Sequence, residues 1–119
     1  MEKIDAVAAL AALAQENRLD VYRLLVQAGP DGLSAGAVAA ALHIVPNTLS
    51  FHFDRLRHAD LVSVARQGRW QIYAARYETM NNLLGYLTEN CCGGKPDLCA
   101  PAACTPPKPA RKRTKEAVR

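Results

Sequence analysis

All four cysteines of this 119-residue chain lie in one short stretch near its end, at Cys91, Cys92, Cys99 and Cys104. A stabilising disulfide framework distributes its cysteines through a fold, so this clustering indicates a site for a soft metal or for thiol redox chemistry. Adjacent cysteines do not match zinc, whose structural sites use C-x₂₋₄-C pairs. In a regular helix two adjacent side chains diverge by about 100°, but the following pair Gly93-Gly94 permits a left-handed turn that breaks this geometry.

Three thiolates suit a soft, three-coordinate ion, and trivalent arsenic and antimony form such sites. Pro96 redirects the chain after the glycines, so that Cys99 can return toward Cys91 and Cys92. We therefore expect these three cysteines to bind As(III) or Sb(III), with no organic cofactor, and we expect Cys104 to be a spare thiol. Two points stay open, namely whether Cys99 comes from the same subunit as the pair and whether the same thiols form a redox switch.

A thiol enzyme, such as one of the arsenate-reductase type, would use the cysteines differently. It would place a low-pKa cysteine at a helix N-terminus or beside a phosphate-binding loop. The cysteines of this chain follow the expected end of a helix, where the dipole disfavours a thiolate, and no Cys-x₅-Arg motif occurs. We therefore expect a binding protein and not an enzyme.

Helices precede this cysteine cluster over most of the chain. Apolar residues at i, i+3 and i+4 spacings predict them, and the breaker Gly29-Pro30-Asp31-Gly32 separates the second helix from the third. Ser34 is expected to be the N-cap of the third helix, and Pro46 suits the first turn of the fourth. The predicted helices cover roughly residues 5–14, 17–28, 35–42, 45–59 and 77–90.

A β-hairpin is expected between the fourth and fifth helices. Residues 61–66 and 70–74 are short β-like runs joined by residues 67–69. Only residues 43–45 separate the third helix from the fourth, which is the length of a helix-turn-helix connection. The order α-α-α-α-β-β-α predicts a mainly α fold with a β-hairpin wing, a winged helix-turn-helix.

The net charge of +4 belongs to the tail. Residues 1–90 carry a net charge of −1, residues 91–119 carry +5, and five Arg against two Asp make residues 43–76 locally basic. We expect a DNA-binding and dimerisation domain over residues 1–92, a cysteine-containing metalloid-binding segment over 93–104, and a disordered basic tail over 105–119. No apolar run is long enough for a membrane span and no secretory signal is evident, so we expect a cytoplasmic protein.

The N-terminal part of the fourth helix offers polar and aromatic side chains that can reach base edges in a major groove. Arg55 lies one turn further along and suits a phosphate, and the wing tip carries two more guanidiniums suited to the DNA backbone or a minor groove. A docking module for another protein, with no DNA contact, is the alternative. The expected DNA-contacting residues are Asn47, Thr48, Ser50, Phe51 or His52, Arg55, Arg66 and Arg69.

The segments 47–53 and 56–62, together with Leu33-Ser34 and residues 38–42, resemble the arsenical-resistance repressor (ArsR/SmtB) family. The resemblance covers about residues 4–92 and implies a homodimeric winged-helix repressor that leaves its operator when a toxic metal or metalloid binds. Two positions depart from the family, because His43 and Asp60 stand where glycine is usual. Both positions are expected to need a positive φ, which His and Asp adopt more readily than most residues.

The resemblance also bears on the type of sensor. Some members bind arsenite through a Cys-x-Cys motif near the helix-turn-helix, but residues 33–38 contain no cysteine, and zinc sensors use Asp and His on a last helix that here has neither. Members with a C-terminal Cys-Cys pair and a later cysteine are similar to this chain. We expect an arsenite- or antimonite-released repressor that dimerises through its first and last helices, including the apolar stripe Met80, Leu83, Leu84 and Leu87, and that binds an imperfect palindrome.

Overall fold

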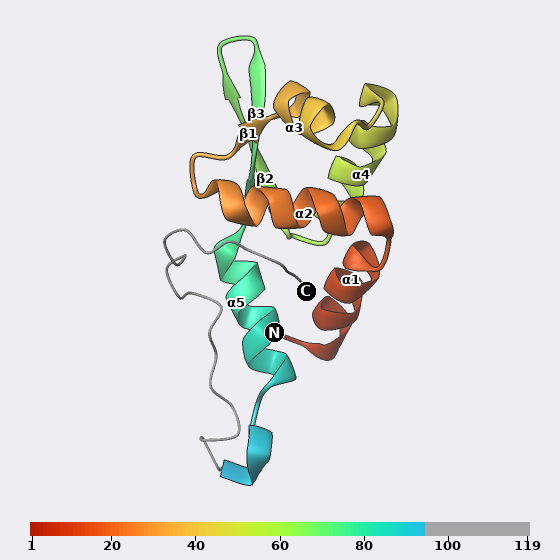
Figure 1. Cartoon of the computed structure of the whole chain (residues 1–119). Coiled ribbons are helices and arrows are strands. Elements are labelled where there is room, and N and C mark those ends of the chain that lie inside the picture. Colours follow the sequence, from red (N-terminus) through yellow and green to blue (C-terminus); the bar gives the residue numbers. More distant parts are fainter. Residues whose placement is uncertain (95–119) are drawn as a thin grey trace, which may run out of the picture. The chain divides into compact units, whose positions relative to one another are not determined.

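The computed structural model describes residues 1–94, whose elements alternate as the sequence predicts apart from one short added strand (Figure 1). The chain divides into a compact unit over Met1–Glu89 and a second unit that begins at Asn90. Cys99, Cys104 and the basic tail lie outside the described residues. The elements are α1 (Lys3–Leu13), α2 (Glu16–Ala28), β1 (Leu33–Ser34), α3 (Ala35–Leu42), α4 (Pro46–His58), β2 (Val62–Gln67), β3 (Trp70–Ala75), α5 (Tyr77–Leu87) and the 3₁₀ turn η1 (Cys91–Gly94).

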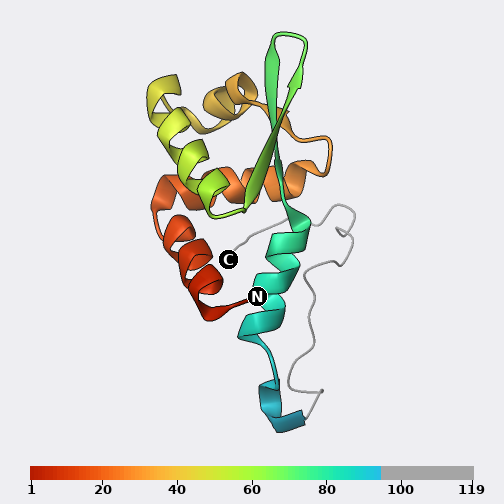
Figure 2. The same ribbon diagram turned by 180° about the vertical axis from the view of Figure 1, so that it is seen from behind.

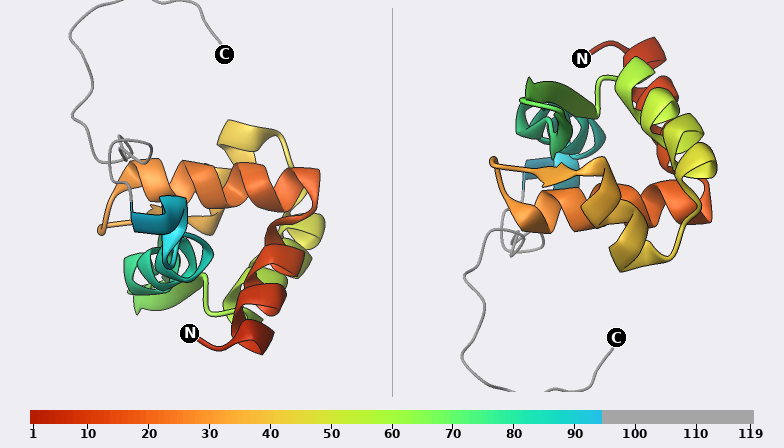
Figure 3. Two further views of the ribbon diagram at one scale, coloured as in Figure 1. Left: turned by 90° about the horizontal axis from the view of Figure 1, so that it is seen from below. Right: turned by 90° about the horizontal axis from the view of Figure 1, so that it is seen from above.

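Within the first unit, the β2–β3 wing projects at the end where α3 and the start of α4 lie, and α1 and α5 lie at the opposite end (Figures 1 and 2). Helix α2 runs between these two ends. Seen from above, α4 runs alongside α1 (Figure 3). The arrangement keeps one end of the unit for the helix-turn-helix and the wing. It confirms the expected winged helix-turn-helix.

Helix α1 packs into the core with its small residues. Ala6, Ala9 and Ala12 are buried, and their methyl groups allow the neighbouring helices to approach closely. The larger apolar residues whose spacing predicted this helix lie on its other side, where Ile4 is 77% exposed and Val7 57% exposed. The alanines thus provide contacts within the core, whereas Ile4 and Val7 stay largely exposed.

The turn between α3 and α4 has the expected geometry. Ser34 caps α3 by accepting a hydrogen bond from the Ala37 backbone N–H at 3.1 Å. His43 ends α3 with φ = 55°, and Asp60 after α4 has φ = 64°, so both departures from glycine occupy left-handed backbone positions as predicted. Val45 is the N-cap of α4 and makes no side-chain capping bond.

The sheet contains one strand that the sequence analysis missed. The strand order is β1-β3-β2, all antiparallel, and Leu33 pairs with Tyr73. Strand β1 has only two residues, which is too short to produce an alternating pattern. Gly32, with φ = 71°, precedes it, and a Cβ at this position would collide with the carbonyl oxygen of Tyr73.

Helix α5 ends earlier than predicted. It stops at Leu87, and the Thr88 hydroxyl donates a hydrogen bond to the Leu84 carbonyl at 2.7 Å. The predicted helix end at residue 90 is therefore three residues too late, because α5 terminates at Thr88 before it reaches Cys91. None of the helices within residues 1–94 is long and apolar enough to cross a lipid bilayer.

Candidate DNA-binding surface

The buried face of α4 fixes which of its side chains point outward. Leu49, Phe53 and Leu56 are at most 2% exposed and pack into the core. Apart from His52, the residues between them face solvent, and Phe51 is 72% exposed. Four predicted DNA contacts lie together on this exposed face of the first turns of α4, namely Asn47, Thr48, Ser50 and Phe51.

His52 does not belong to this surface. Its side chain is buried at 8% exposure, and neither ring nitrogen has a hydrogen-bond partner among residues 1–94. Burial lowers the pKa of His52, and the nearby positive charge of Arg18 lowers it further. Of the two alternatives, Phe51 is the residue available to DNA, and the placement of His52 among the DNA contacts is corrected.

The wing tip presents two arginines and an aromatic ring. Gly68 occupies the first position of the two-residue turn between the paired Gln67 and Trp70, with a φ of 64° that a tight hairpin of this kind favours. Arg66 near the end of β2 and Arg69 at the second position of the turn are both exposed. Trp70 is 60% exposed at the same tip, and the sequence analysis missed it. Its position next to the predicted hairpin turn could have identified Trp70 as a wing-tip residue.

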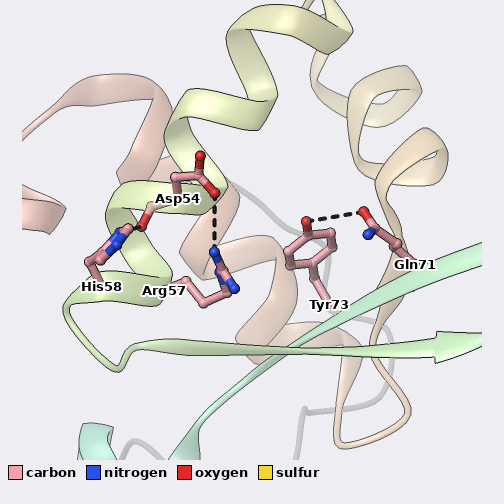
Figure 4. A network of polar contacts seen from close by, with 5 residues as sticks. All are labelled: Asp54, Arg57, His58, Gln71 and Tyr73. Atoms are coloured by element: carbon pink, nitrogen blue, oxygen red, sulfur yellow. Dashed lines mark hydrogen bonds and ion pairs between the residues drawn. The ribbon is translucent and has the colours of Figure 1, made fainter.

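An aromatic contact joins α4 to the wing. The rings of Phe53 and Tyr73 stack with centroids 3.7 Å apart and an interplanar angle of 3°. Tyr73 and Gln71 both belong to β3. The Tyr73 hydroxyl donates a weak hydrogen bond to the Gln71 side chain at 3.5 Å (Figure 4). Burial raises the pKa of Tyr73. The helix and the wing therefore pack on one another through a stacked pair.

Arg55 lies apart from these residues. It is exposed on the C-terminal half of α4 and lines a cleft with Arg18 and His58. The basic side chains of the predicted site thus fall into two groups, one at the wing tip and one on the flank of α4.

The two described cysteines lie in the turn η1 and are partly exposed. Cys92 and Gly93 have φ values of 59° and 56°, so the chain makes the left-handed turn that the sequence predicts. Within residues 1–94 no three His, Cys, Asp or Glu side chains come together as a metal site. The expected third ligand, Cys99, lies outside the described residues, so the three-cysteine site stays a prediction.

Comparison with known proteins agrees with this geometry. Residues 13–65 match the model of a helix-turn-helix domain family. The uncharacterized HTH-type transcriptional regulator YceK of Bacillus subtilis is 36% identical over 77 residues, which cover 64% of this chain and 76% of YceK. HlyU from Vibrio cholerae is 32% identical with a TM-score of 0.59, over 73% of this chain and 97% of HlyU. NolR from Sinorhizobium fredii is 29% identical with a TM-score of 0.58, over 71% and 82% of the two chains.

The fold and the exposed face of α4 define a DNA-binding protein of the winged-helix class. The chain belongs to the HTH-type transcriptional regulators. It is ArsR-like in fold, since an ArsR-like regulator from Rhodococcus superposes with a TM-score of 0.64 at 24% identity, over 71% of this chain and 76% of that one.

Proposed function

We propose that the chain is a homodimeric repressor that binds an imperfectly palindromic operator and is released by trivalent arsenic or antimony. The observation that carries the dimer is the set of large apolar side chains left outside on α1 and α5. Such side chains grouped on contacting helices mark an interaction surface. They are Ile4, Val7, Leu10, Leu84 and Leu87, which are 42–77% exposed.

A solved structure of similar fold supports the dimer. The winged helix-turn-helix domain Mb0332 from Mycobacterium bovis is described as homodimeric. A two-fold axis through α1 and α5 would leave the start of α4 and the wing of each subunit free, because these lie at the opposite end of the unit (Figure 1). Two recognition helices about 34 Å apart would then read two half-sites one helical turn apart.

The dimer is tested with Leu84→Glu, which places a charge in the proposed interface. The control is Leu19→Glu on α2, because Leu19 is similarly exposed at 43%. We expect sedimentation to show monomers for Leu84→Glu and dimers for Leu19→Glu, with operator affinity lost only in the former. A wild-type chain that sediments as a monomer at micromolar concentration would overturn the proposal.

For the inducer, we propose that Cys91, Cys92 and Cys99 supply three thiolates to As(III) or Sb(III). The left-handed backbone at Cys92 supports this assignment, because it removes the regular helical divergence of two adjacent side chains. Soft thiolate ligands select thiophilic ions. Bound metalloid would then weaken operator binding by about 1–3 kcal/mol, which corresponds to some 5–150-fold.

A redox-responsive repressor is the second candidate. One of the similar structures is described as reduced HlyU from Vibrio cholerae, and this chain also has adjacent, partly exposed cysteines. In this version, oxidation of two thiols to a disulfide, with peroxide as the oxidant, takes the place of metalloid binding.

The two candidates are separated by titrating the operator complex with arsenite, antimonite, zinc, cadmium and peroxide while following fluorescence anisotropy. We expect arsenite or antimonite to release the DNA, and Ser at Cys91, Cys92 or Cys99 to abolish release without affecting DNA binding. Cys104→Ser is the matched control and should respond as the wild type does. Release by peroxide alone would favour the redox version, and a response in all four variants would exclude the cysteine site.

A further inference from the structure

A cleft of about 230 Å³ opens where α1, the start of α2 and the C-terminal half of α4 meet. The alanines of α1 form an apolar wall, and the longer side chains of the other two helices supply its polar part. No carboxylate lines it. The lining residues are Ala8, Ala11, Ala12, Arg18, Arg55, His58 and Ala59.

The two arginines of this cleft lack an acidic partner. Among the described residues neither Arg18 nor Arg55 forms an ion pair. The Nε of Arg18 donates a hydrogen bond to the Ala12 carbonyl at 2.6 Å, which fixes the stem of the side chain and leaves the other guanidinium nitrogens available. Two like charges in one cleft repel each other, so a bound anion would stabilise the pair.

The two carboxylates nearest to Arg55 and His58 along the chain are already paired with other arginines. Asp54 pairs with Arg57 at 3.4 Å, and Asp60 pairs with Arg76 at 3.9 Å. Figure 4 shows the Asp54 carboxylate turned toward Arg57, while the His58 ring lies on the far side against the Asp54 backbone carbonyl. The positive charge of the cleft is therefore not neutralised from α4.

The ring of His58, which lines the same cleft, is held by a contact to the backbone. Its Nδ1 lies 2.7 Å from the Asp54 carbonyl, and because a carbonyl only accepts, Nδ1 carries the proton of this bond. The ring is thereby held in one orientation, and Nε2 is its remaining polar atom. When protonated, Nε2 becomes a third donor beside the two guanidiniums.

We propose that this cleft binds a phosphate group. Guanidinium groups match the tetrahedral oxyanion with paired charge-assisted hydrogen bonds, and the cleft is large enough for one such group. The group can belong to the DNA backbone beside α4 or to a free phosphorylated small molecule. Binding of a phosphate of the DNA backbone rests on the proposed function, whereas binding of a free phosphorylated molecule does not.

The test uses Arg55→Gln on the full chain, with Arg23→Gln as the control because Arg23 is exposed on α2 outside the cleft. The first measurement is an NMR titration with inorganic phosphate. The second is the slope of log affinity against log salt for a duplex without an operator. Circular dichroism checks that both variants fold, and His58→Gln provides a second, independent removal of a lining group.

Phosphate binding that weakens at least tenfold in Arg55→Gln but not in Arg23→Gln supports the cleft. A salt slope that falls by about one only in Arg55→Gln assigns the group to DNA, and an unchanged slope with lost phosphate binding assigns it to a free ligand. The proposal is overturned if neither measurement distinguishes Arg55→Gln from Arg23→Gln. A chain that binds no DNA but still takes up phosphate in the cleft would refute the proposed function alone.

Discussion

Replacing Gly32 by alanine tests how the short strand β1 is held against the wing. Gly32 has φ = 71°, and its Cα faces the backbone of Tyr73 so closely that an added methyl group collides with the Tyr73 carbonyl oxygen. The next residue, Leu33, pairs with Tyr73 in the sheet. The variant therefore combines an unfavourable backbone conformation with a clash against backbone that cannot rotate away.

The magnitude follows from these two contributions. An alanine in the left-handed region costs about 1–2 kcal/mol. Forcing a packed neighbour to move costs about 1–3 kcal/mol more, so Gly32→Ala should lower the free energy of unfolding by about 2–5 kcal/mol. Gly68→Ala is the matched control, because its φ is similar at 64° but no atom lies within 4 Å of the added Cβ. It should cost only the first contribution.

Urea unfolding followed by circular dichroism measures both variants. All samples need the same protein concentration, because association of subunits contributes to the apparent stability. We expect the Gly32 variant to be less stable than the Gly68 variant by about 1–3 kcal/mol. Equal stability of the two variants, within about 0.5 kcal/mol, would refute the close approach of Gly32 to Tyr73.

Of three further predictions, two concern the DNA-binding surface and one concerns the buried His52. Asn47→Ala should weaken operator binding by about 1–3 kcal/mol and leave binding to unrelated DNA unchanged, whereas Arg69→Ala should weaken both and lower the salt slope by about one, as measured by anisotropy. Trp70 is the sole tryptophan, so its fluorescence should change when DNA binds, and an unchanged spectrum would place the wing tip away from DNA. The pKa of His52 is lowered below 6.5 in the folded chain, so the unfolded chain takes up this proton first as the pH falls. Stability should therefore drop below about pH 6.5, and His52→Leu should reduce this drop in urea unfolding; an identical pH profile would contradict the burial.

Long periodic elements were predictable from the sequence, and details decided by packing were not. The spacing of apolar residues predicted α4 and the hairpin to within a few residues. The N-cap at Ser34 was predictable because capping depends only on residues next to the helix start. Strand β1 carries no such pattern, because two residues cannot alternate. Its formation depends on the distant backbone of Tyr73 and on a glycine that leaves room for it.

The candidate site shows the same division. Phe51 and His52 point about 100° apart on the helix, and only the packed core determines that Phe51 is outside and His52 is buried. For α1, alanines and large apolar residues form two stripes, and hydrophobic spacing alone does not tell which stripe packs within the chain. The cleft around Arg55 also escaped prediction, because it depends on Arg18, which is distant in sequence.

The early end of α5 changes how a ligand on the cysteines would reach the DNA-binding end. Metalloid bound at the turn η1 would not alter the helix directly, since three residues separate Leu87 from Cys91. Its effect would pass along the chain to Thr88, whose hydroxyl bonds to the carbonyl of Leu84 in the proposed dimer stripe. One hydrogen bond contributes about 0.5–1.5 kcal/mol, so losing this bond in both subunits would amount to about 1–3 kcal/mol. That range is similar to the coupling that the proposed release requires, so we propose the Thr88 cap as the link between the thiols and the dimer.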